Sequence, residues 1–169
     1  LAVGALYRFG VGLWESADHF ADLPTADSQD DIEGRVMLDV LAGSRAWVSV
    51  IGRYGYQRPD AQVFRIPSAR HVPFAPLATR QALARDLGDY LSIDVTPRYV
   101  LSRAVALSAS YQFFSKGEDA YSLGVATGDT TRVGDPAVLA AGTARQSQRA
   151  VVALTYSTLS EYFQRRARV

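Results

Sequence analysis

The chain has 169 residues and no cysteine, which excludes disulfide frameworks and thiolate metal sites. Its 18 basic residues are balanced by 17 acidic residues, and the net charge of +1 argues against a nucleic-acid-binding protein. No apolar run approaches the ~18 residues that indicate a transmembrane helix. The remaining signal is a hydrophobic period of two, which is typical of β-strands.

The first predicted strand covers residues 1–14, where the odd positions are apolar and the even positions are mostly small, with one charge at Arg8. The same period predicts five more strands, at 34–42, 46–57, 89–100, 104–114 and 147–157. A seventh strand could begin near Arg166. The sequence therefore predicts an all-β fold that forms a single domain.

The predicted connections alternate in length along the chain. Long ones cover 15–33, 58–88 and 115–146, and short ones cover 43–45, 101–103 and 158–161. Long loops on one rim and tight turns on the other are typical of outer-membrane barrels. Within the second long connection, Leu77–Leu87 is a candidate short helix.

The two faces of the predicted strands differ in chemistry. We expect one face to line a polar lumen, with an excess of arginine that favours anions; alternatively, its charges pair across strands and brace or plug the lumen. We expect the other face to contact lipid through aromatic residues near both rims. The expected lumen-lining residues are Arg8, Asp39, Arg53, Asp94, Arg98 and Arg149, and the expected girdle residues are Tyr54, Tyr56, Tyr99, Tyr111, Phe113 and Tyr156. By parity Trp14 and Trp47 point inward, and Pro97 costs its strand one ladder bond.

The segments YLSIDVTPRY (90–99) and AVALSASYQFF (104–114) resemble a hairpin of a Gram-negative outer-membrane β-barrel protein. This class-level resemblance implies a transmembrane antiparallel up-and-down barrel in the bacterial outer membrane. It also implies contact with membrane lipid and lipopolysaccharide. Barrels of this class act as passive pores, substrate-specific channels, adhesins or anchors, and a few are enzymes. Of these roles we expect a pore or transporter for small solutes, without enzymatic activity or a cofactor. Barrels of this class have at least eight strands and usually end on an aromatic residue, whereas this chain shows six or seven and ends at Arg165–Val169. We therefore expect an incomplete barrel, completed by missing ends or by several chains.

The predicted long loops carry opposite charges. The first holds seven acidic residues and no basic one, which suits Ca²⁺, although the spacing matches no calcium motif and a solvated loop is the simpler interpretation. These residues are Glu15, Asp18, Asp22, Asp27, Asp30, Asp31 and Glu33. The second holds arginines that could attract the acidic loop or bind lipopolysaccharide phosphates, namely Arg58, Arg65, Arg70, Arg80 and Arg85, against Asp60 and Asp86.

Evidence for catalysis is sparse. His19, close to Asp18 and Asp22, could activate water as in surface proteases, but any acidic loop with a histidine has this composition. His71 is the other histidine, and no nucleophile elbow, phosphate-binding loop or zinc-protease motif occurs. Two alternatives to a pore remain: a structural or plugged barrel, and a soluble barrel whose apolar face binds a lipophilic ligand inside.

Overall fold

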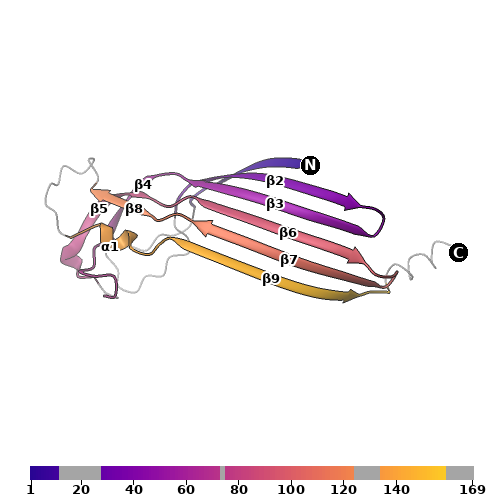
Figure 1. Ribbon diagram of the computed structural model, residues 1–169. Coiled ribbons are helices and arrows are strands. Elements are labelled where there is room, and N and C mark those ends of the chain that lie inside the picture. Colours follow the sequence, from indigo (N-terminus) through magenta and orange to yellow (C-terminus); the bar gives the residue numbers. More distant parts are fainter. Residues whose placement is uncertain (12–27, 73–74, 124–133, 159–169) are drawn as a thin grey trace.

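The computed structural model describes residues 1–11, 28–72, 75–123 and 134–158. The protein is all-β, with two antiparallel sheets (Figure 1). The larger sheet has six strands in the order β1-β2-β3-β6-β7-β9. Their bounds are β1 Ala2–Arg8, β2 Asp31–Ala42, β3 Ala46–Gln57, β6 Tyr90–Val100, β7 Val105–Lys116 and β9 Arg145–Tyr156.

The smaller sheet lies beyond the end of the large sheet that is opposite the short β2–β3 and β6–β7 turns (Figure 1). It contains β4 (Asp60–Arg65), β5 (Arg80–Asp86) and β8 (Ala120–Leu123), and is accompanied by the 3-10 turn η1 (Leu77–Thr79) and the short helix α1 (Ala137–Ala140). Along the chain, β4 follows β3, β5 precedes β6 and β8 follows β7, each at a distance of a few residues. The order β4-β5-β8 therefore repeats the order β3-β6-β7. The middle of the large sheet is therefore extended at one end only.

Tight backbone contacts join the two sheets. The Gly88 N–H donates a hydrogen bond to Asp119 Oδ1 at 2.8 Å, and the Asp119 N–H donates to the Thr143 hydroxyl at 2.8 Å. A Cβ on Gly88 would lie 2.2 Å from the carbonyl oxygen of Gly117. Glycine at position 88 is thus required for the two chain segments to pass this closely.

The buried core lies with the smaller sheet. Among the described residues, the largest fully buried side chains are Arg85, Ile66 and Leu83. Arg85, which is 1% exposed, forms a two-point ion pair with Asp60 at 2.8 and 2.7 Å. In the described part of the chain, by contrast, no second layer covers the face of the large sheet that carries Val36, Leu38 and Val40, and these residues remain exposed.

The structure changes several expected element boundaries. The six predicted strand ranges each overlap a strand of the large sheet, but β1 ends at Arg8 and β2 begins at Asp31. The predicted helix at Leu77–Leu87 is wrong: after η1, the residues form β5. Gln81, Leu83 and Arg85 are buried alternately, so pairing with β4 and β8 overrides the helix propensity of this Ala-, Leu- and Arg-rich segment.

The other differences concern the predicted loops and the closure of the sheet. The predicted loops 58–88 and 115–146 contain β4, β5, β8 and α1. Within the described residues the large sheet is open, with β1 and β9 at its edges. None of the helices described is long and apolar enough to cross a membrane. Trp14, residues 159–161 of the predicted turn at 158–161, and the candidate strand at Arg166 lie outside the described residues.

Candidate functional site

The pairing register places every charged side chain of the six strands on one face of the large sheet, here called the polar face. Neighbouring strands align residue by residue, and side chains alternate between faces, so the assignment carries across all five strand pairs. The charged residues of the polar face are Arg8, Asp31, Glu33, Arg35, Asp39, Arg53, Asp94, Arg98, Lys116, Arg145 and Arg149.

The six residues expected to line a lumen all belong to the polar face, but they do not form one cluster. Arg53 pairs with Asp94 at 2.7 Å across β3 and β6. The guanidinium of Arg98 lies 5.0 Å from the ring centre of Trp47, a cation–π contact. Asp39 accepts a hydrogen bond from Ser49, and the two remaining residues, Arg8 and Arg149, lie on the edge strands.

Arg8 belongs to a denser charged cluster that the sequence did not reveal. Arg8 pairs with Asp31 at 2.9 Å and approaches Glu33 at 3.9 Å, and Arg35 also contacts Glu33. Asp31 and Glu33 are only 2% and 4% exposed. Both residues belong to the predicted acidic loop, because the predicted strand begins at residue 34, whereas β2 begins at Asp31. The signal for their place on the strand is their two-residue spacing, which is in phase with Arg35.

Tyr90 completes this cluster from two strands away. Its hydroxyl donates a hydrogen bond to Glu33 at 2.6 Å, although β3 lies between β2 and β6. The ring crosses β3 at Gly55, where a Cβ would lie 2.1 Å from a ring carbon of Tyr90. Gly55 therefore makes room for the contact, and Tyr90 also stacks on Phe114.

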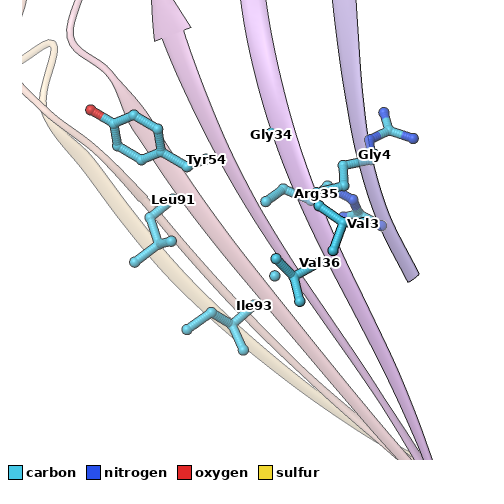
Figure 2. A pocket seen from close by; sticks show the side chains of 10 residues that line it. Val3, Gly4, Gly34, Arg35, Val36, Tyr54, Leu91 and Ile93 are labelled. Atoms are coloured by element: carbon cyan, nitrogen blue, oxygen red, sulfur yellow. The ribbon is translucent and has the colours of Figure 1, made fainter. Parts of the chain in front are cut away.

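The opposite face, here called the apolar face, has no charged residue in any of the six strands. It contains a shallow hollow of about 400 Å³ (Figure 2). Val3, Val36, Leu91, Ile93 and Tyr54 surround this hollow, and Gly34 and Gly52 form part of its floor. A Cβ on either glycine would contact nothing within 4 Å. Large apolar side chains on this face are widely exposed, including Val36, Leu38, Val40 and Val152.

The six expected girdle residues all lie on the apolar face, together with Tyr7. Tyr54 and Tyr7 point their hydroxyls beyond the strands, where they bond Asp89 and Asp30. The hydroxyl of Tyr7 and the N–H of Gly10 hold the pKa of the Asp30 carboxyl below its usual range. Tyr111 lies farther from the strand end than expected, because β7 continues to Lys116 and Tyr111 is paired with Val95 near the middle of β6.

The charged residues of the predicted loops are partly engaged with one another. Arg58 lies 3.8 Å from Asp30, so the basic and acidic segments do meet there. Arg85 is buried against Asp60 and is not available to phosphates, which corrects the expectation for this residue. Among the described residues no carboxylate or histidine group is arranged to hold a metal ion. Glu15, Asp18, His19, Asp22 and Asp27 lie outside them.

Comparison with protein-family models gives no match, and a search of curated proteins gives none either. The function is therefore inferred from the two faces of the large sheet.

Proposed function

We propose that the large sheet is part of the wall of a transmembrane β-barrel of the bacterial outer membrane, and that its polar face lines a path for small solutes. The observation that carries this proposal is the segregation of charge. Eleven charged side chains lie on one face and none lies on the other, which exposes large aliphatic and aromatic side chains. A barrel wall between lipid and a polar interior requires this pattern.

The energetics favour lipid as the neighbour of the apolar face. Monomeric soluble proteins rarely expose contiguous apolar patches beyond a few hundred Å², whereas this face runs across six strands without a charge. Tyrosine hydroxyls that reach polar partners beyond the strand ends also suit the lipid headgroup level. The smaller sheet, joined at the end opposite the tight turns, would then project beyond the membrane on the long-loop side.

A membrane wall leaves no open edge, because unpaired backbone groups are costly in lipid. The proposal therefore requires β1 and β9 to be paired by segments outside the described residues or by other chains. The charged cluster around Glu33 then braces the wall, and the rest of the polar face lines the path.

Membrane extraction followed by conductance measurement tests the proposal. A lipid-facing wall should resist an alkaline wash of the membranes and be released only by detergent, and the purified protein should form conducting channels in planar bilayers. Release by the alkaline wash would contradict the membrane location and favour a soluble lipid-binding barrel. Stable insertion without conductance would favour a plugged barrel.

A further inference from the structure

The charges of the polar face are unevenly distributed across the sheet. All four of its carboxylates lie on β2 and β6, as Asp31, Glu33, Asp39 and Asp94. The neighbouring pair β7 and β9 carries only basic charges, which are Lys116, Arg145 and Arg149. One side of the polar face is therefore mixed in charge, and the other is purely cationic.

The carboxylates of the mixed side do not neutralise the cations of the other. Three of the four are held in the ion pairs described above, and the fourth accepts a hydrogen bond from Ser49. On the cationic side, Lys116 contacts Asp119 at the junction. Arg145 and Arg149 are exposed and form no ion pair in the part of the chain that the structure describes.

The register shows how isolated Arg149 is. It lies opposite Gln112, which lies opposite Asp94. Two strand spacings separate Arg149 from that carboxylate, or about 10 Å, which exceeds the Debye length of ~8 Å at physiological salt. Asp94 is also already paired at 2.7 Å with Arg53. The other neighbours of Arg149 on this face of β7 and β9 are uncharged, namely Ser110, Phe114, Ser147 and Val151. Its positive charge therefore acts on the ions in front of this face.

We propose that the solute path prefers small anions and that Arg145 and Arg149 on β9 are the residues that set this preference. This inference rests on the proposed function, since it names the solute class that the path would take. A unit charge about 6 Å from a permeating ion, screened at physiological salt, changes the chloride-to-potassium ratio by about threefold.

Reversal potentials across a planar bilayer in a KCl gradient test the proposal. The wild-type protein should prefer chloride, and R145Q/R149Q should lower the chloride-to-potassium permeability ratio by about threefold for each charge removed. R145K/R149K should retain the preference, since the charge remains. The matched control R65Q/R80Q also removes two arginines, but from β4 and β5 of the smaller sheet outside the proposed path, so it should leave the ratio close to that of the wild type.

The outcomes separate this inference from the function on which it rests. Channels that conduct but prefer potassium, or whose ratio is the same in wild type and R145Q/R149Q, would overturn the anion preference alone. Inserted protein that does not conduct would overturn the solute path, and the anion preference with it. Resistance to an alkaline wash shows that each variant has inserted.

Discussion

Replacing Leu38 with arginine puts a charge on the apolar face of β2, whereas the same change at Met37 puts it on the polar face. The two positions are matched, because both lie on β2 and the two residues are 41% and 38% exposed. In water the two substitutions should therefore cost similar, small amounts. In a lipid-facing wall, arginine near the bilayer midplane costs about 2–4 kcal/mol.

The prediction concerns the difference in folding stability between the two variants. Leu38→Arg should lower the folding equilibrium constant in bilayers by roughly 30- to 700-fold, since each ~1.4 kcal/mol is tenfold. Met37→Arg lies two residues from Asp39 on the same face and should change stability by less than ~1 kcal/mol. Reversible urea unfolding in phospholipid vesicles, followed by tryptophan fluorescence, measures both. Equal losses for the two variants would refute the assignment of the faces.

Three further predictions concern the smaller sheet and the junction. Burial raises the pKa of Tyr121 in the folded protein. The stabilisation that the protonated tyrosine gives should therefore be present below pH ~10 and be lost as pH rises through the pKa of the folded state. In Tyr121→Phe, the free energy of unfolding should fall less steeply when it is measured up to about pH 11. Gly88→Ala should cost about 1–3 kcal/mol because its Cβ meets backbone, while Gly34→Ala, with open space around it, should be neutral or stabilising by up to ~1 kcal/mol; equal effects in denaturant melts would contradict this difference. Arg85→Ala should cost about 3 kcal/mol because it leaves the Asp60 carboxylate without its paired cation, and adding Asp60→Asn should recover part of the loss; no recovery would show that the cost comes from packing.

The alternation of apolar and polar residues was sufficient to predict the strands of the large sheet. Each strand pairs mostly with its sequence neighbours, so the local period also gives the face of Arg53, Asp94 and Tyr54. The smaller sheet could not be predicted in this way, because β5 is short, rich in good helix formers and buried only through its partners. The Glu33–Tyr90 contact was equally hidden, since it depends on a glycine on a third strand.

The most direct test of the central claim is a spin-label scan along β2, made simple by the absence of native cysteine. Single cysteines introduced at residues 36 to 40 would carry nitroxide labels in protein reconstituted into phospholipid vesicles. Labels on the apolar face, at Val36, Leu38 and Val40, should collide mainly with dissolved oxygen, which concentrates in lipid. Labels at Met37 and Asp39 should collide mainly with a water-soluble nickel chelate. Accessibility that fails to alternate, or that alternates in the opposite phase, would contradict a wall with lipid on its apolar face.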